Sequence, residues 1–487
     1  MRAPLRFLVA LFLWSAASSA PRLGDERNVL LVVLDDVGIE QIAAFGDVPP
    51  VVRAPLPNLD RLAAEGLTFH RAYGNPSCSP TRALLQTGRY AFRTGIGRTT
   101  GQQSGLPLGE ATIAEVLQAG AAGRRIACGM FGKWHLYRHA DARLVATQGY
   151  ERFEGTVQNV PDHFDWEEIA ADVSGASTRR VGSGLGPYDE TTFSASVTRA
   201  AALRWINAQS SPFFACVAFH APHEPYQIPP YSVLSASTVT NLRQARLLPG
   251  QQVGGSGNAS PYGYALLLEA LDTEIGRLIE GIDPELRQRT TILIVGDNGT
   301  PGALLPPPHQ SSRGKHSIYE SGIRVPLIAS GYGVESCDDG SHALISAVDL
   351  LPTIIDLMGC DAGISATAGP LDGQSFARVL ADPSYGGERT LVFAQLFEPN
   401  GAYVPQPQVV ASSRYARHDR SLSDGELKYV RRWNATTRRY ADEAYHLTVD
   451  PLEIFDLHPS LAAGALAPEI AQRLHSLAKA MEQLSGR

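Results

Sequence analysis

Apolar and polar positions along the chain predict strands that end in clusters of polar residues. Asn28 to Gly38 reads NVLLVVLDDVG, a β-branched apolar run that ends in two carboxylates and a glycine. Such a run is typical of a strand that is buried on both faces of a sheet. Segments 211–226 (SPFFACVAFHAPHEPY) and 289–302 (RTTILIVGDNGTPG) repeat the pattern. Each predicts an apolar strand that leads into polar residues and turn formers.

Helix-spaced apolar residues occur between these predicted strands. They lie in segments 58–73 (NLDRLAAEGLTFHRAY) and 112–120 (TIAEVLQAG). Alternating strands and helices favour an α/β fold, with a large mixed, mostly parallel central sheet flanked by helices. Toward the C-terminus the pattern changes to short strand-like pieces and a closing helix from about Pro468. We therefore predict a main domain over 25–380 and a smaller α+β domain with an antiparallel sheet over 381–487.

The N-terminus predicts an exported protein. Arg2 and Arg6 precede an apolar run, and small residues follow this run up to Ala20. The pattern is typical of a cleavable secretory signal, which we place at residues 1–20. The run is shorter than the roughly 20 apolar residues that span a bilayer. We expect no stable membrane span and a periplasmic, secreted or lysosomal location, with an uncleaved anchor as the alternative.

Length and charge narrow the classes of function. The 487 residues are 44% hydrophobic, which is enough for one very large domain or two ordinary ones. A formal net charge of -7 is mild for this length, and no long run of Lys or Arg occurs. We therefore expect no nucleic-acid partner, and any anion site must be local.

Five cysteines is an odd number for an exported chain, because such chains normally pair their thiols. Cys128 and Cys216 lie in apolar, strand-like runs, where unpaired buried thiols are expected. Cys337 and Cys360 could pair or stay free. Cys78 differs because its neighbours in NPSCSPTR are polar and turn-forming. On its own it could be a nucleophile, a disulfide partner, a metal ligand or a small buried side chain.

Oxygen-bearing side chains follow two of the apolar strands. Asp35 and Asp36 end the first strand, and Asp297 and Asn298 end another. Ligands gather beyond the carboxyl ends of strands in open α/β sheets. Three carboxylates and an amide oxygen suit a hard cation such as Ca²⁺ or Mg²⁺. Either pair alone would be a helix cap or a turn, but charges at the ends of apolar strands are costly unless they are coordinated.

Basic side chains and histidines occupy further loop positions. Lys133 and His135 are two residues apart in GKWHL, so in an extended segment both point to the same side. His223 lies in HAPHEPY, and Lys315 lies in RGKHSIYE. Cations that converge on a cation-binding carboxylate cluster indicate an anion held between metal and protein. Sulfate and phosphate esters fit this pattern of charge.

The ordered set of motifs resembles that of the type I sulfatases. CSPTRALLQTGR is similar to the family's signature, in which the cysteine of a C-x-P-x-R motif is oxidised to formylglycine after synthesis. LDDVG, GKWHL, PHEP, GDNG, GKHSIYESGIRVP and DPLEIFDL resemble further landmarks in the family's order, over about residues 28–457. The resemblance implies an alkaline phosphatase-like fold, a catalytic domain at 25–380, and hydrolysis of aryl or carbohydrate sulfate esters.

The resemblance also implies a role for each matched residue. Formylglycine at position 78, as its hydrate, would attack sulfur, after a formylglycine-generating maturation enzyme had acted on the chain. His135 would take a proton from the second hydroxyl of the hydrate, and His223 or Lys315 would protonate the leaving oxygen. The implied catalytic residues are Cys78, Arg82, Lys133, His135, His223 and Lys315. The implied ligands of a cation, Ca²⁺ in preference to Mg²⁺, are Asp35, Asp36, Cys78, Asp297 and Asn298.

The chain departs from the usual family motifs at two positions. Thr81 stands where serine is most frequent, and it keeps the hydroxyl group. Ser321 stands where a second glycine is frequent, next to Gly322, and it could alter the turn after Lys315. Neither difference removes one of the implied catalytic groups.

Two other functions fit the same residues. One is a phosphate or phosphonate ester hydrolase of the same superfamily, and the other is a catalytically silent, calcium-stabilised binding protein. The sulfated partner could be a small molecule or a glycan, because all of these present the same sulfate group. We expect loops at 162–189, 247–264 and 398–408 to contact the organic half of the substrate.

Overall fold

The computed structural model describes residues 27–45, 53–100, 105–121, 123–137, 143–254, 260–360, 369–401 and 415–485. The predicted signal at 1–20 lies outside these residues, as do parts of the predicted loops 247–264 and 398–408. Among the described residues, no helix has both the length and the apolar character that a bilayer span requires.

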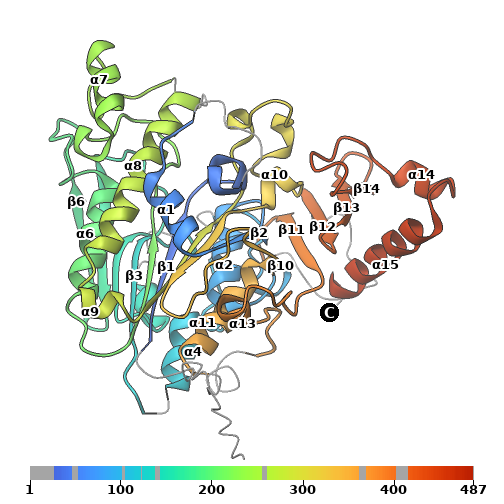
Figure 1. Cartoon of the computed structure of the whole chain (residues 1–487), viewed down its shortest axis with the longest axis horizontal. Coiled ribbons are helices and arrows are strands. Elements are labelled where there is room, and N and C mark those ends of the chain that lie inside the picture. The colour runs from blue at the N-terminus through green and yellow to red at the C-terminus, as the bar shows by residue number, and fades with distance from the viewer. Residues whose placement is uncertain are drawn as a thin grey trace, which may run out of the picture.

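A ten-stranded mixed sheet forms the centre of the molecule (Figure 1). Its strands are β1 (Asn28–Leu34), β2 (Leu67–Tyr73), β3 (Ala127–Lys133), β4 (Arg152–Thr156), β5 (Trp166–Asp172), β6 (Gly175–Val181), β7 (Phe213–Ala218), β8 (Thr290–Gly296), β9 (Leu327–Gly331) and β10 (Ser341–Ser346). Their order is β10-β2-β9-β8-β1-β7-β3-β4-β5-β6. The five strands from β8 to β4 are parallel, whereas β9, β5 and β6 pair antiparallel with their neighbours. The predicted large, mixed, mostly parallel sheet is confirmed.

Two hydrophobic cores lie on the two faces of this sheet. Alternate residues of β1 enter different cores: Val29, Leu31 and Val33 enter one, and the residues between them enter the other. This is the double burial that the apolar run predicts. Helices α2, α4, α11 and α13 cover the first face, and α1, α6 and α8 cover the second (Figure 1).

The α-helices vary from single turns to the long α8. Their bounds are α1 (Pro57–Glu65), α2 (Cys78–Thr87), α3 (Ala91–Thr94), α4 (Ile113–Gly120), α5 (Leu144–Thr147), α6 (Ser194–Ile206), α7 (Ala236–Gln244), α8 (Pro261–Glu280), α9 (Pro284–Arg287), α10 (Glu320–Ile323), α11 (Leu350–Leu357), α13 (Ala377–Ala381), α14 (His458–Ala462) and α15 (Pro468–Ser485).

The helix-spaced pattern over 58–73 is helical only in its first half. Helix α1 ends at Glu65, and Leu67 then begins strand β2, so a helix over the whole segment is wrong. Gly66 separates the two elements, and a Cβ atom there would lie 2.1 Å from the backbone oxygen of Ala329. Glycine therefore lets the chain pass close to β9 and enter the sheet.

A four-stranded antiparallel sheet forms the C-terminal part, in the order β11-β12-β13-β14. Its strands are β11 (Val392–Glu398), β12 (Arg417–Ser423), β13 (Leu427–Asn434) and β14 (Arg439–His446). Helix α15 packs on β12 and β13 (Figure 1). The predicted antiparallel sheet and closing helix are confirmed, whereas the domain boundary after residue 380 stays a prediction. In β11, the backbone N–H of Gln395 donates to Asn75 Oδ1 at 3.0 Å, next to the segment that contains Cys78.

Candidate active site

The predicted oxygen ligands meet at the carboxyl ends of two neighbouring parallel strands. β1 and β8 are paired in register up to their last residues, so the residues that follow both strands emerge side by side. The backbone N–H of Asp36 donates to Asp297 Oδ1 at 3.2 Å, and Asn298 Nδ2 donates to Asp36 Oδ1 at 2.9 Å. Asp35, Asp36, Asp297 and Asn298 are all buried.

This cluster fits a divalent cation. The side-chain oxygen of Asn298 is buried and accepts no hydrogen bond from the described residues. Asp35, Asp36, Cys78 and His223 each offer one potential ligand atom, and these atoms lie within 4.8 Å of one another. A buried acceptor beside several carboxylates is the environment that a hard cation satisfies. His223 joins the group although the motifs imply no metal-binding role for it.

The pKa values of the buried carboxylates show that these groups repel one another. Burial and the neighbouring Asp35 raise the pKa of Asp297 to about 6, against the attraction of Arg82. For Asp35 itself burial also opposes ionisation, but Lys133 and other cations hold its pKa well below the usual range. An additional positive charge between these carboxylates would relieve their repulsion.

Cys78 is the first residue of α2, and its side chain is buried. Its thiol donates to Asp35 Oδ1 at an Sγ–Oδ1 distance of 3.4 Å. Burial, followed by the charge of Asp297, raises the pKa of the Cys78 thiol, and the nearby Lys133 and Lys315 only partly oppose this shift. The group therefore stays a neutral thiol at neutral pH, which is a poor nucleophile compared with a thiolate.

Arg82 lies one helical turn after Cys78, so the C-x-P-x-R spacing places both side chains on one face of α2. Its Nε and Nη2 atoms donate to Asp297 Oδ2 at 3.0 and 2.8 Å. Its Nη1 donates to the backbone oxygen of Lys133 at 2.6 Å. The guanidinium group thus joins the helix to the ends of β8 and β3. Its position is set by three hydrogen bonds inside the buried cluster.

Two lysines pair with different aspartates of the same cluster. Lys133, the last residue of β3, is fully buried and pairs with Asp35. Lys315 Nζ lies 2.5 Å from Asp36 Oδ1. Both ammonium groups are close enough to Cys78 to lower the pKa of its thiol. Both lysines therefore belong to the cluster around Cys78, and their role in binding sulfate stays a prediction.

His135 does not lie in an extended segment. Strand β3 ends at Lys133, and His135 has a left-handed backbone with a φ of 60°, so the argument from strand alternation is wrong. The side chains of Lys133 and His135 are nevertheless both buried. Thr100 Oγ1 donates to the backbone oxygen of His135 at 3.0 Å. Burial and the charge of Lys133 hold the pKa of His135 well below its usual range. Its Nδ1 has no hydrogen-bond partner among the described residues.

His223 lies in the loop after β7 and presents Nε2 to the cluster, 3.9 Å from Asp36 Oδ2. Its Nδ1 lies 2.8 Å from the backbone oxygen of Glu224. A carbonyl oxygen can only accept, so Nδ1 carries the proton in this contact and Nε2 is the atom that faces the site. Burial lowers the pKa of His223, although Asp36 opposes the shift.

His163 is hydrogen-bonded to the backbone of His223 and belongs to no recognisable sequence motif. It is buried, and its Nε2 donates to the backbone oxygen of His223 at 3.0 Å. Its Nδ1 accepts from the hydroxyl of Ser194 at 2.7 Å. Its partners lie 60 and 31 residues away along the chain, so no local pattern marks it. Only its place in the predicted loop 162–189 could have drawn attention to it.

The remaining cysteines and His220 have structural roles. All five cysteines lie in the described residues, and Cys337 and Cys360 do not form a disulfide with each other. Cys128 and Cys216 are buried in β3 and β7, as their apolar runs predict. His220 Nε2 lies 2.8 Å from Thr156 Oγ1, which fits the interpretation of this histidine as a buried, hydrogen-bonded side chain.

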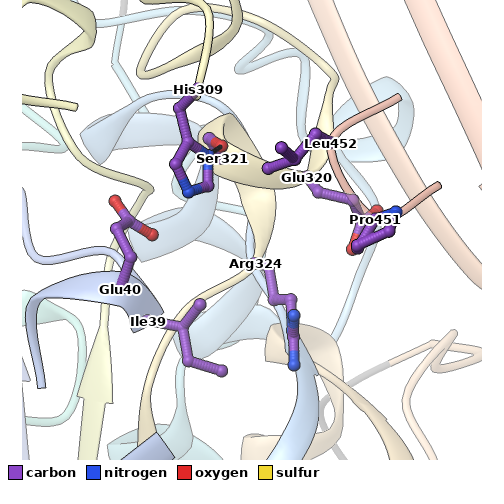
Figure 2. Close-up of a pocket in the computed structure, with 8 residues that line it drawn as sticks. All are labelled: Ile39, Glu40, His309, Glu320, Ser321, Arg324, Pro451 and Leu452. Atoms are coloured by element: carbon purple, nitrogen blue, oxygen red, sulfur yellow. Dashed lines mark hydrogen bonds between the residues drawn. The ribbon is translucent and has the colours of Figure 1, made fainter. Parts of the chain in front are cut away.

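The two departures from the family motifs each have a structural consequence. The hydroxyl of Thr81 accepts from the backbone N–H of Asn75 at 2.7 Å and donates to its carbonyl at 3.1 Å, so it closes the turn before α2. Ser321 Oγ lies 2.9 Å from His309 Nδ1. Figure 2 shows these two side chains together on the wall of a cavity of about 260 Å³. None of the predicted site residues lines that cavity.

Comparisons with known proteins point to one family. The model of the Sulfatase family matches residues 27–360. The chain is 28% identical to arylsulfatase A of Homo sapiens, over 99% of this chain and 92% of that protein. It is 29% identical to N-acetylgalactosamine-6-sulfatase of Homo sapiens, over 70% of this chain and 63% of that protein.

Solved structures share the fold. The PsFucS1 sulfatase from Pseudoalteromonas sp. has a TM-score of 0.68 and 20% identity, and the match covers 95% of this chain and 91% of that one. Ps i-CgsB in complex with k-i-k-neocarrahexaose has a TM-score of 0.69 and 20% identity, with coverages of 94% and 93%. The large mixed sheet and the smaller antiparallel sheet together match the alkaline phosphatase-like fold of sulfatase structures.

Proposed function

Because the chain belongs to the type I sulfatase family and is a sulfuric ester hydrolase, we propose that it hydrolyses aryl or carbohydrate sulfates with the group at position 78 as nucleophile. The observation that carries this proposal is the buried cluster around Cys78. Three carboxylates and one amide oxygen meet the side chains of two lysines and one arginine there. Such a set can hold a cation and the negatively charged group of a sulfate ester side by side.

Two groups would complete this site, namely formylglycine formed from Cys78 and a divalent cation, Ca²⁺ in preference to Mg²⁺. Formylglycine would supply two hydroxyl groups when hydrated, and the cation would supply Lewis-acid polarisation of a sulfate oxygen. Asp35, Asp36, Asp297 and Asn298 would hold the cation together with the side chain at position 78. The unpartnered oxygen of Asn298 supports this assignment. The maturation enzyme that makes formylglycine would be a transient partner of the chain.

Lys133 and Lys315 would bind the sulfate oxygens from two sides. Each already lies against one aspartate of the cluster, so each is held near position 78 before substrate binds. Arg82 keeps the first turn of α2 fixed to Asp297. These positive charges stabilise the transition state most, because negative charge on the transferring and leaving oxygens is greatest there.

His223 is the better candidate for the acid that protonates the leaving oxygen. Burial lowers the pKa of Lys315, but the charge of Asp36 outweighs burial and raises this pKa well above its usual range. Lys315 therefore releases its proton poorly. His223 has a lowered pKa and presents Nε2 to the site, and a bound sulfate would favour its protonated form. His135, neutral and with an unpartnered Nδ1, would accept a proton at position 78.

Peptide mass spectrometry and a paired assay test the proposal. We expect an aldehyde at position 78 in the peptide that covers residues 72–82, and an intact thiol in fully active protein would overturn the mechanism. Sulfate and phosphate esters of the same alcohol should be assayed side by side. We expect faster turnover of the sulfate ester, and faster turnover of the phosphate ester would favour the related phosphate or phosphonate hydrolase instead.

The location of the protein belongs to the same proposal. Residues 1–20 have the composition of a secretory signal, and the described residues include no helix that could span a membrane. We therefore propose export from the cytoplasm. Sequencing the N-terminus of the protein after expression with residues 1–20 present would test this, and an intact Met1 would contradict a cleaved signal.

A further inference from the structure

A cavity of about 270 Å³ lies beside position 78 and is called here the side cavity. It is separate from the cavity in Figure 2 and shares no lining residue with it. Its polar wall comes from the loop after α3 (Arg98 and Thr99), the residue after Lys315 (His316), the end of β11 (Glu398) and the start of β12 (Arg417).

Hydrogen bonds join the side cavity to the turn that carries the nucleophile. Thr99 Oγ1 lies 2.8 Å from the hydroxyl of Ser77, the residue that precedes Cys78. The backbone N–H of His316 donates to the backbone oxygen of Pro76 at 2.7 Å. The side cavity therefore lies against the turn that carries position 78.

Two guanidinium groups line the side cavity, those of Arg98 and Arg417. The side chains of Arg98 and Arg417 are 46% and 41% exposed. Arg98 pairs with Glu398 through Nη1, and Arg417 donates from Nε to Asp419 Oδ2 at 2.7 Å and from Nη2 to His316 O at 2.8 Å. Within the described residues, Nε and Nη2 of Arg98 and Nη1 of Arg417 make no hydrogen bond. Each guanidinium is thus oriented by a partner and keeps a donor for a ligand.

The lining favours an anion over an aryl group. Leu396 and Phe397 are buried, so the apolar residues of the wall offer little surface to an aromatic ring. An aryl group would also cover charged side chains without replacing their hydrogen bonds to water, which is unfavourable. Two of the three charged residues in the lining are arginines, and Asp419, which pairs with Arg417, lies outside the lining. Guanidinium groups bind carboxylate and sulfate groups through paired hydrogen bonds.

We propose that the side cavity binds a second anionic substituent of the substrate, a carboxylate or a second sulfate on a saccharide, and that Arg98 and Arg417 select for it. This inference rests on the proposed sulfatase activity and narrows its substrates to acidic saccharides. The sulfate that is cleaved lies at position 78, and the second anion lies in the side cavity and does not react.

Steady-state kinetics of the matured, calcium-loaded enzyme can test the inference. The substrates are a monosulfated neutral hexosamine, the equivalent monosulfated uronic acid, and the disulfated hexosamine. We expect a higher kcat/KM for at least one of the two acidic substrates than for the neutral one, and the preferred one identifies the second anion as carboxylate or sulfate. Arg98→Gln and Arg417→Gln should each lower this preference by about 10- to 100-fold, mainly through KM, as expected for one charge-assisted hydrogen bond.

Arg125→Gln is the matched control, because Arg125 is also an exposed arginine that pairs with a glutamate, Glu151, but it lies near the amino end of β3. It should leave the preference unchanged. Equal kcat/KM values for all three substrates in the wild type, or equal losses on all three in both cavity variants, would overturn the inference and leave the sulfatase proposal intact. An aryl sulfate is assayed in parallel. Sulfate release from the aryl sulfate alone would overturn this inference and leave the sulfatase proposal intact, whereas no release from any of the four substrates would overturn both.

Discussion

Lys428→Met should strongly destabilise the protein, because Lys428 is a fully buried cation held by two carboxylates. Its Nζ lies 2.9 Å from Glu320 Oε1 and 2.9 Å from Glu453 Oε1. Glu453 Oε2 also accepts the backbone N–H of Glu320 at 2.7 Å, and Tyr73 donates its hydroxyl proton to Glu320 Oε2 at 3.1 Å. Because these residues come from β13, α10, β2 and the loop after β14, the group joins the small sheet to the large one.

The size of the effect follows from what the substitution leaves behind. Removing one partner of a buried ion pair costs about 3–5 kcal/mol, because the remaining charge has no compensation. Burial already raises the pKa of Glu453 to about 7, despite the attraction of Lys428. A carboxyl group whose folded pKa is raised contributes stability that is present below its unfolded pKa and is lost as pH rises through the folded value. Without Lys428 this loss of stability is larger. The free energy of unfolding of the variant should therefore fall further below that of the wild type at pH 8 than at pH 5.

Urea unfolding followed by circular dichroism at pH 8 and pH 5 measures both effects. Lys479→Met is the control, since Lys479 is an exposed lysine on α15, and its substitution should change the unfolding free energy by less than about 0.5 kcal/mol. Adding Glu320→Gln and Glu453→Gln to Lys428→Met should recover part of the lost stability, because no buried charge then remains. A loss below about 1 kcal/mol at pH 8, or an equal loss at both pH values, would refute the reasoning.

Three further predictions concern the site. Cys78→Ala should keep the thermal midpoint within a few degrees but lower sulfate-ester turnover by more than about 10³-fold, and retained turnover would exclude position 78 as nucleophile. A chelator should lower both turnover and the thermal midpoint, and Ca²⁺ should restore both better than Mg²⁺. The Asn298→Leu variant should need about tenfold more Ca²⁺ for half-maximal turnover, and an unchanged Ca²⁺ requirement would exclude Asn298 as a ligand. A thiol reagent should label only the partly exposed Cys337 in the native protein, because the other four cysteines are buried and burial raises the pKa of the Cys216 thiol to about 12. In urea the reagent should count four thiols if Cys78 is formylglycine and five if it is not.

The strands at the centre of the large sheet could be predicted because they carry their signal locally. A strand buried on both faces needs apolar residues at every position, and β1 and β8 show this in unbroken runs. Strand β2 was missed because its sequence, LTFHRAY, mixes polar and apolar residues and follows a helix without an obvious break. Its pairing with β9 and β10, which are more than 250 residues away along the chain, decides its conformation. Local spacing contains no information on partners at that distance.

The candidate site also contains residues that could be predicted from the sequence and residues that could not. Asp35, Asp36, Asp297 and Asn298 could be grouped from the sequence because parallel strands in register bring their carboxyl ends to one edge. The side cavity could not be foreseen, because the residues that form it are each ordinary in their local segment. Arg98 and Glu398 are 300 residues apart, and they meet only because β11 packs against the loop after α3. Residues that react must keep motifs that the chemistry dictates, whereas residues that select a substrate need only a suitable position in the folded chain. The sequence therefore identifies the sulfate half of the substrate, and the fold is needed to propose the saccharide half.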